Sequence, residues 1–193
     1  DYEFLFNNKL NEIMCYINKF YKHTKIYILT HNSMDLFNNL IIDNKKYIYK
    51  TFTVNNFHKK LLQQYDISNI DVFKNYVTKT NKVETRTSFR YKIVYVGRLS
   101  TEKNIDFLIN TFNYISKEIP QLKLYIIGSG NKYKSSNQNI IFTGYLNKTE
   151  IKHHLLSSDY LILPSYTEGL PFCILEAMNL GIPCITSNIV GVN

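Results

Sequence analysis

The sequence has 193 residues, of which 45% are hydrophobic and 20% are charged, and its formal net charge is +8. This composition is normal for a globular protein, and no apolar run approaches the ~18 residues that a membrane-spanning helix needs. The lysines are scattered rather than gathered in a stripe with aromatic residues, which argues against nucleic-acid binding. Three widely spaced cysteines argue against a disulfide framework and a zinc site.

The beginning of the sequence has no basic segment followed by an apolar one, as a secretory signal would have. We therefore expect a cytoplasmic protein, and its positive charge leaves peripheral contact with an anionic membrane open. The sequence starts at Asp1 without a methionine and stops at Asn193, just after an expected strand. We expect it to be truncated at both ends.

Glycine and proline divide the chain into two parts. All seven glycines lie between Gly97 and Gly191, and all four prolines lie between Pro120 and Pro183. The first part therefore has neither residue that commonly interrupts regular structure, while the second part is interrupted at regular intervals.

In the first part, three apolar runs predict strands and two periodic segments predict helices. The strands are expected at Lys25–Thr30, Tyr47–Thr53 and Ile70–Phe73. The first helix has an apolar stripe of Leu5, Leu10, Ile13, Met14, Ile17 and Phe20. The second helix follows the N-cap residue Asn55 and has an apolar face of Phe57, Leu61, Leu62 and Tyr65. The polar segment Asn75–Ser88 has no sustained period, which is typical of a linker.

In the second part, short apolar runs alternate with helical segments, which predicts a parallel sheet covered on both faces. The strands are expected at Ile93–Val96, Leu122–Ile127, Ile140–Thr143, Tyr160–Leu163 and Cys184–Ser187. The helices are expected along an apolar stripe from Ile105 to Ile119, after a capping box formed by Asn147 and Glu150, and near Cys173–Leu180.

Ligands of parallel sheets bind beyond the carboxyl ends of the strands. Those ends hold Gly97-Arg98, Gly128-Ser129-Gly130, Gly144-Tyr145 and Pro164–Gly169. Glycines there let the backbone approach a ligand closely. The third glycine of a dinucleotide-binding fingerprint is missing, because position 133 is a tyrosine, and this argues against a nicotinamide cofactor.

Four charged residues follow these strands. Arg98 and Lys103 bracket a turn that enters a helix, and with the helix N-terminus they would form a diphosphate site. Glu168 and Glu176, with seven residues between them, could each accept hydrogen bonds from a sugar diol. The alternative is that Arg98 and Lys103 are solvated surface charges, Glu168 a solvated loop residue and Glu176 an ordinary helix residue.

Two segments resemble the glycosyl transferases group 1 family. Val96–Asn104 (VGRLSTEKN) is similar to the turn of that family that carries an arginine and a lysine. Pro164–Pro183 (PSYTEGLPFCILEAMNLGIP) is similar to its E-x7-E signature. The detailed match runs from about Lys92 to Gly191, and a weaker one reaches back to about Lys25.

The resemblance implies an α/β fold of the GT-B type, with two Rossmann-like domains that contain parallel sheets. Residues 1–75 would be the later part of an incomplete N-terminal, acceptor-side domain, residues 76–90 a linker, and residues 91–193 a nucleotide-sugar-binding domain that lacks its end. It also implies sugar transfer with retention of anomeric configuration.

The resemblance assigns roles to individual residues. Arg98 and Lys103 would hold the donor diphosphate, Glu168 the donor sugar, Glu176 the ribose, and Tyr145 would contact the base. The expected donor-binding residues are Gly97, Arg98, Lys103, Gly128, Tyr145, Glu168, Gly169, Leu170, Pro171, Phe172 and Glu176. The expected catalytic residues are Arg98, Lys103, Glu168 and His31. A lone histidine at a strand end is often structural, so both interpretations of His31 remain open.

The expected function is that of a retaining glycosyltransferase in polysaccharide or glycoconjugate synthesis. Its donor would be a nucleotide-diphosphate sugar, with a UDP-sugar as the first guess, and its acceptor a hydroxyl group of a glycan or a lipid-linked molecule. No Asp-x-Asp motif occurs, so we expect neither a metal nor another cofactor. The alternatives are a non-hydrolysing sugar-nucleotide epimerase and an inactive nucleotide-sugar-binding subunit.

Overall fold

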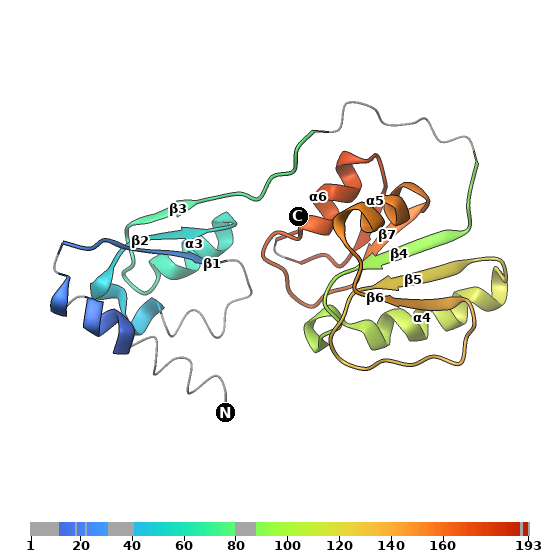
Figure 1. The fold of residues 1–193 in the computed structure, drawn as a ribbon, viewed down its shortest axis with the longest axis horizontal. Coiled ribbons are helices and arrows are strands. Elements are labelled where there is room, and N and C mark those ends of the chain that lie inside the picture. Colours follow the sequence, from blue (N-terminus) through green and yellow to red (C-terminus); the bar gives the residue numbers. More distant parts are fainter. Residues whose placement is uncertain are drawn as a thin grey trace. The chain divides into compact units, whose positions relative to one another are not determined.

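The computed structural model describes residues 12–17, 19–21, 23–30, 41–79, 88–189 and 191–192. The chain divides into two compact units (Figure 1). The first unit comprises residues 1–75 together with the short segment Glu168–Leu170, and the second comprises residues 76–167 and 171–193.

The first unit contains a parallel three-stranded sheet in the order β1-β2-β3. The strands span Ile26–Thr30 (β1), Ile48–Thr53 (β2) and Ile70–Val72 (β3), within one residue of the predicted limits at each end. A short 3-10 helix, η1, occupies Lys45–Tyr47. Helix α3 spans Asn56–Gln63 and begins as predicted, because the Asn55 side chain accepts a hydrogen bond of 2.8 Å from the His58 amide.

The apolar face predicted for α3 is wrong in part. His58 and Leu62 are its buried residues, whereas Phe57 is 47% exposed. Positions four residues apart share a face of a helix, so His58 aligns with Leu62 and Phe57 does not. Packing against the rest of the unit decides which face of the helix is buried, and it buries this one. Near the N-terminus, Met14 is buried as predicted but Ile13 is exposed. The core of this unit is a small cluster of Ile41, Leu62, Ile67 and Ile70.

The second unit contains a five-stranded sheet in the order β6-β5-β4-β7-β8, and every neighbouring pair is parallel, as predicted. The strands span Lys92–Val96 (β4), Lys123–Ile127 (β5), Ile140–Gly144 (β6), Tyr160–Leu163 (β7) and Cys184–Thr186 (β8). The helices span Thr101–Lys103 (η2), Ile105–Glu118 (α4), Lys148–Leu156 (α5) and Phe172–Asn179 (α6).

The helices of the second unit cover both faces of its sheet. The chain moves in one direction along the sheet through α4, and in the opposite direction through α5 and α6. Right-handed crossovers therefore place α4 on one face and the other two helices on the opposite face, and Figure 1 shows this arrangement.

Of the residues that the structure describes, more are buried in the core of the second unit than in that of the first. Val94, Tyr95, Leu124, Ile126 and Leu161 are fully buried. The predicted stripe of α4 packs against them through Ile105, Leu108, Ile109 and Phe112. The capping box of Asn147 and Glu150 at the start of α5 is also confirmed.

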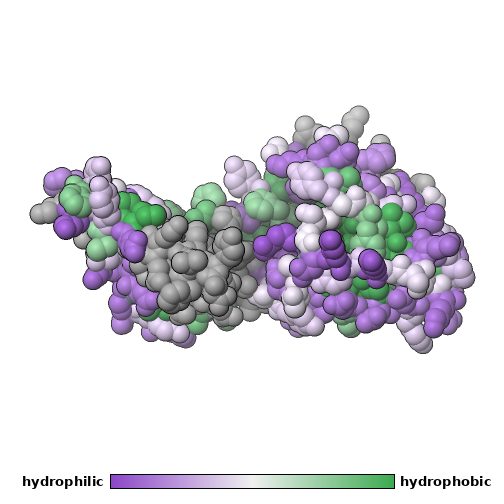
Figure 2. All heavy atoms as spheres, turned by 60° about the horizontal axis from the view of Figure 1, so that its bottom comes forward, coloured by the Kyte–Doolittle hydropathy of each residue, from purple (hydrophilic) through white to green (hydrophobic). Residues whose placement is uncertain are grey.

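Where Figure 2 shows the surface of the second unit, hydrophilic side chains surround a smaller apolar patch. Within the described ranges, no helix is long and apolar enough to cross a membrane.

Candidate functional site

Three glycines lie side by side where β4, β5 and β6 end. The Gly97 amide donates to the Ile127 carbonyl at 3.0 Å, and the Gly128 amide donates to the Gly144 carbonyl at 2.9 Å. The glycines that end the three strands therefore meet at one edge of the sheet, as expected for parallel strands.

The backbone at this edge is packed too closely for side chains. A Cβ atom at Gly128 would lie 1.8 Å from the Gly97 carbonyl oxygen, and the φ of Gly128 is +145°, in a region that favours glycine. Gly130 repeats this arrangement, with a φ of +142° and a Cβ position 2.5 Å from the Leu99 carbonyl oxygen. The backbone at Gly128 and at Gly130 therefore leaves no space for a side chain.

The two predicted cations bracket the entrance to α4. Arg98 directly follows Gly97, and its side chain is 66% exposed. Lys103 is the last residue of η2, Asn104 then takes up a left-handed conformation with a φ of 57°, and α4 begins at Ile105. Helix N-terminal amides and nearby cations both favour an anion. The turn can therefore bind a group such as a diphosphate.

A carboxylate that the sequence analysis did not single out lies between these cations. Glu102 Oε1 accepts hydrogen bonds from Ser100 Oγ at 2.6 Å and from Arg98 Nη2 at 3.3 Å. Burial alone would raise the pKa of the Glu102 carboxyl, but the Ser100 hydroxyl, the Glu102 amide and the charges of Arg98 and Lys103 together hold that pKa below its ordinary value. Glu102 is therefore ionised at neutral pH.

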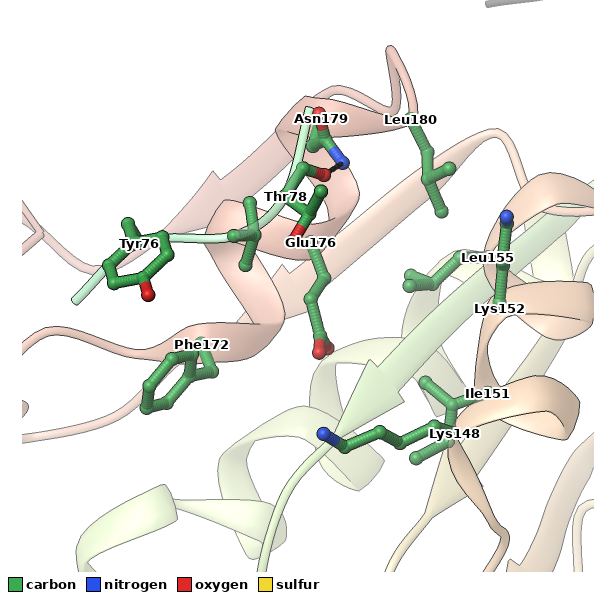
Figure 3. A pocket seen from close by; sticks show the side chains of 11 residues that line it. Tyr76, Thr78, Lys148, Ile151, Lys152, Leu155, Phe172, Glu176, Asn179 and Leu180 are labelled. Carbon is green, nitrogen blue, oxygen red and sulfur yellow. Dashed lines mark hydrogen bonds between the residues drawn. The ribbon is translucent and has the colours of Figure 1, made fainter. Parts of the chain in front are cut away.

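Glu176 lies in a pocket of about 390 Å3 between α5, α6 and the segment that begins at Tyr76 (Figure 3). Burial raises the pKa of the Glu176 carboxyl, and the Lys148 charge partly opposes this effect. In Figure 3 the Glu176 carboxylate and the Lys148 amino group point toward one another from α6 and α5. Phe172 also lines the pocket, and Asn179 Nδ2 donates to the Thr78 carbonyl at 2.9 Å.

Glu168 is buried, with 7% of its surface exposed, in the connection between β7 and α6. This excludes the alternative that it is a solvated loop residue. The segment Glu168–Leu170 groups with the first unit. There, Asn55 Nδ2 donates to the Gly169 carbonyl at 2.8 Å, and Asn75 Nδ2 donates to the Leu170 carbonyl at 2.7 Å. Pro171 is the N-cap residue of α6.

The structure thus brings some of the predicted residues together and leaves others apart. Gly97 and Gly128 share one edge of the sheet, and Tyr145, which is 79% exposed, follows the third glycine of that edge. Glu176 and Phe172 share the pocket, whose lining includes neither Arg98 nor Lys103. His31 lies outside the described residues. In the parts of the chain that are described, no group of three His, Cys, Asp or Glu side chains could hold a metal ion.

Glu102 and Lys148 were not among the site residues predicted from the sequence. A signal for Glu102 was available, since it stands four residues after Arg98 and directly before Lys103. Lys148 follows the N-cap residue Asn147 directly, which placed it at a helix start, but nothing in the sequence indicated that it shares a pocket with Glu176.

The sequence is similar to those of known glycosyltransferases. The model of the family described as glycosyl transferases group 1 matches residues 77–193. The chain is 36% identical over 120 residues to the Escherichia coli UDP-Gal:alpha-D-GlcNAc-diphosphoundecaprenol alpha-1,3-galactosyltransferase. The aligned region covers 56% of this chain and 30% of that protein. It is 29% identical over 181 residues to an uncharacterized glycosyltransferase of Methanocaldococcus jannaschii, with 86% of this chain and 44% of that protein covered.

The fold also has a solved counterpart. The crystal structure of TarM superimposes with a TM-score of 0.75 and 20% sequence identity, over 88% of this chain and 37% of TarM. The chain therefore has the α/β architecture of a GT-B protein. It spans less than half the length of each of these three relatives. The match of the family model over more than half of the sequence shows that the chain belongs to the glycosyl transferases group 1 family.

Proposed function

We propose that the whole protein is a retaining glycosyltransferase that moves a sugar from a nucleotide-diphosphate sugar to a hydroxyl acceptor in polysaccharide or glycoconjugate synthesis. The observation that carries the proposal is the position of Arg98 and Lys103 at the start of α4. Both follow the sheet edge at which Gly97 and Gly128 pack closely together. The name of the Escherichia coli relative includes a UDP-sugar donor and a lipid-linked acceptor. We extend both classes of substrate to this protein.

In the proposed reaction, the bond between the sugar and the diphosphate breaks as the acceptor oxygen attacks the same face of the sugar. The acceptor proton passes to an oxygen of the departing phosphate. The main electrostatic task of the protein is to neutralise that departing group, which suits Arg98, Lys103 and the amides at the start of α4. Glu168 would accept hydrogen bonds from the sugar hydroxyls and Glu176 from the ribose. A role for His31 rests on the family resemblance alone.

The proposal places the protein in the cytoplasm, where nucleotide sugars are available. A lipid-linked acceptor would bring it to a membrane surface. The net charge of +8 would favour contact with anionic lipid there.

Isothermal titration calorimetry tests the roles of the acidic and basic residues. Arg98→Ala and Lys103→Ala should each weaken UDP and a UDP-sugar alike, by roughly 1.5–3 kcal/mol for a lost charge-assisted hydrogen bond. Glu176→Ala should weaken both ligands, because both contain the ribose. Glu168→Ala should weaken only the UDP-sugar. The matched control is Lys123→Ala, which removes a cation at the opposite end of the sheet, where β5 begins. If Glu168→Ala weakens UDP as much as the UDP-sugar, its assignment to the sugar is wrong.

A second measurement concerns metal ions. Because two side-chain cations and a helix N-terminus are proposed to neutralise the diphosphate, UDP should bind with the same affinity in excess EDTA as in its absence. A loss of binding on chelation that Mn²⁺ or Mg²⁺ restores would contradict this part of the proposal.

A further inference from the structure

We propose that Glu102 is a positioning residue of the diphosphate site, whose carboxylate holds the Arg98 guanidinium at the entrance to α4. Removing this negative charge would then weaken diphosphate binding rather than strengthen it. The inference rests on the proposed function, because it assumes that Arg98 receives a diphosphate.

The first support is the set of contacts that the Glu102 side chain makes. Its Oε1 atom accepts a short hydrogen bond from Ser100 Oγ, at 2.6 Å, and forms an ion pair with Arg98 Nη2 at 3.3 Å. The Glu102 side chain is 34% exposed and that of Arg98 66% exposed. The Glu102 side chain is the more buried of the two and is held by Ser100. It can in turn restrain the more exposed side chain of Arg98.

The second support is the charge of the site. A carboxylate between two cations opposes an incoming diphosphate, because like charges repel. By charge alone, therefore, Glu102 should reduce affinity, and a neutral residue would serve better. Arg98, however, loses rotational freedom when it binds a ligand, and a partner that already restrains the side chain reduces that loss. The ion pair uses one of the five N–H donors of a guanidinium, so donors remain for phosphate oxygens.

The third support is the main chain of the same residue. The Glu102 carbonyl accepts a hydrogen bond of 2.8 Å from the Tyr166 amide, which joins the turn to the connection that follows β7. This bond involves no side chain of Glu102. Substitutions at position 102 therefore keep the turn attached, and their effects report on the carboxylate.

The experiment is calorimetry of the 193-residue chain with UDP and with uridine, which lacks the phosphates. Glu102→Ala should lower the affinity for UDP by about tenfold, as expected for the loss of a charge-assisted hydrogen bond. Glu102→Gln keeps an oxygen acceptor for Ser100 and Arg98, so its loss should be smaller, about threefold. Ser100→Ala should weaken UDP in the same direction. Uridine affinity should stay unchanged in all three variants.

Asp106→Asn is the matched control. Asp106 is an exposed carboxylate in the first turn of α4, so its removal changes the charge near the helix start without touching the Arg98 ion pair. This variant should bind UDP as tightly as the unaltered chain or more tightly. A loss of UDP affinity on removal of the Glu102 charge, with no loss on removal of the Asp106 charge, separates positioning from electrostatics.

Three outcomes would count against the inference. UDP affinity that Glu102→Ala leaves unchanged or increases, at an unchanged melting temperature, would overturn it. A parallel loss of uridine affinity would assign Glu102 a purely structural role and also overturn it. If the unaltered chain binds none of UDP, GDP and ADP, the proposed function itself fails and the role of Glu102 falls with it.

Discussion

Glu176 combines a partly buried carboxylate with a cation in the same pocket. Burial raises the pKa of this carboxyl above its ordinary value of 4.5. The folded state therefore binds the proton more tightly than the unfolded state, and the stability that this provides is present below pH 4.5 and is lost as the pH rises through the folded pKa. Above that pKa, the ionised carboxylate lowers the free energy of unfolding.

We expect Glu176→Gln to remove this pH dependence. The free energy of unfolding of the unaltered chain should fall relative to that of the variant as the pH rises above 4.5 and through the folded pKa of Glu176. Urea denaturation at several pH values measures this difference. Glu118→Gln, which removes an exposed carboxylate at the end of α4, is the control. A Glu176→Gln curve that is parallel to the unaltered one would show that burial does not disfavour the charged form.

A substitution of Lys148 provides a second test of the Glu176 pKa. The charge of Lys148 lowers the Glu176 pKa, so Lys148→Met should raise that pKa further. The side-chain carboxyl chemical shift of Glu176 in an NMR titration reports the pKa directly, and Lys152→Met, also in the pocket lining, is the comparison.

At the scale of elements, the ends of β4 and β5 are held together by backbone that has no space for a side chain. We expect Gly128→Ala to destabilise the protein by more than about 2 kcal/mol, because it combines a φ unsuited to alanine with a clash against the Gly97 carbonyl. Gly144→Ala is the matched control. Gly144 also has a positive φ, of +74°, but its Cβ position has no neighbour within 4 Å.

The control should therefore lose only about 1 kcal/mol, the strain of a left-handed conformation. Urea denaturation of both variants measures the two losses. Equal losses would show that the close approach of Gly128 to Gly97 is relieved by a small shift of the backbone, and that the edge is less rigid than its geometry indicates.

The elements of this protein could largely be predicted from the sequence. Short apolar runs that end at glycine or proline located β4, β6 and β7, because strands of a parallel sheet that is covered on both faces do not alternate with polar residues. The cap residues Asn55 and Asn147 located two helix starts, because capping is a local interaction.

Contacts between distant segments could not be predicted in the same way. Which face of α3 is buried depends on how the helix packs against the rest of its unit, so Phe57 was assigned to the wrong side. The burial of Glu168 and the position of Lys148 opposite Glu176 depend on packing between elements far apart in the sequence. Motif spacing located the strand ends and the cations of the site, but it carried no information about those neighbours.

At the scale of the whole molecule, the two units differ in how much apolar surface they bury. Among the described residues, the core of the second unit includes residues from all five strands or their flanking turns and from three helices, whereas that of the first contains four buried side chains. The first unit also buries polar groups, among them Thr51, Thr53 and His58, and the Thr51 hydroxyl has no hydrogen-bond partner among the described residues. Because buried apolar area is the main stabilising contribution, we expect the first unit to open at a lower free energy than the second.

Native-state hydrogen exchange followed by mass spectrometry measures this difference, with β2 reporting on the first unit and β5 on the second. Two matched substitutions sharpen the test. Leu62→Ala and Leu124→Ala each remove a buried leucine side chain, and each should cost about 2–5 kcal/mol. If each unit has its own cooperative core, Leu62→Ala should accelerate exchange in β2 only, and Leu124→Ala should accelerate it in β5. A Leu62→Ala variant that accelerates exchange equally in both strands would show that the two cores unfold as one, and the division into two domains would then be wrong.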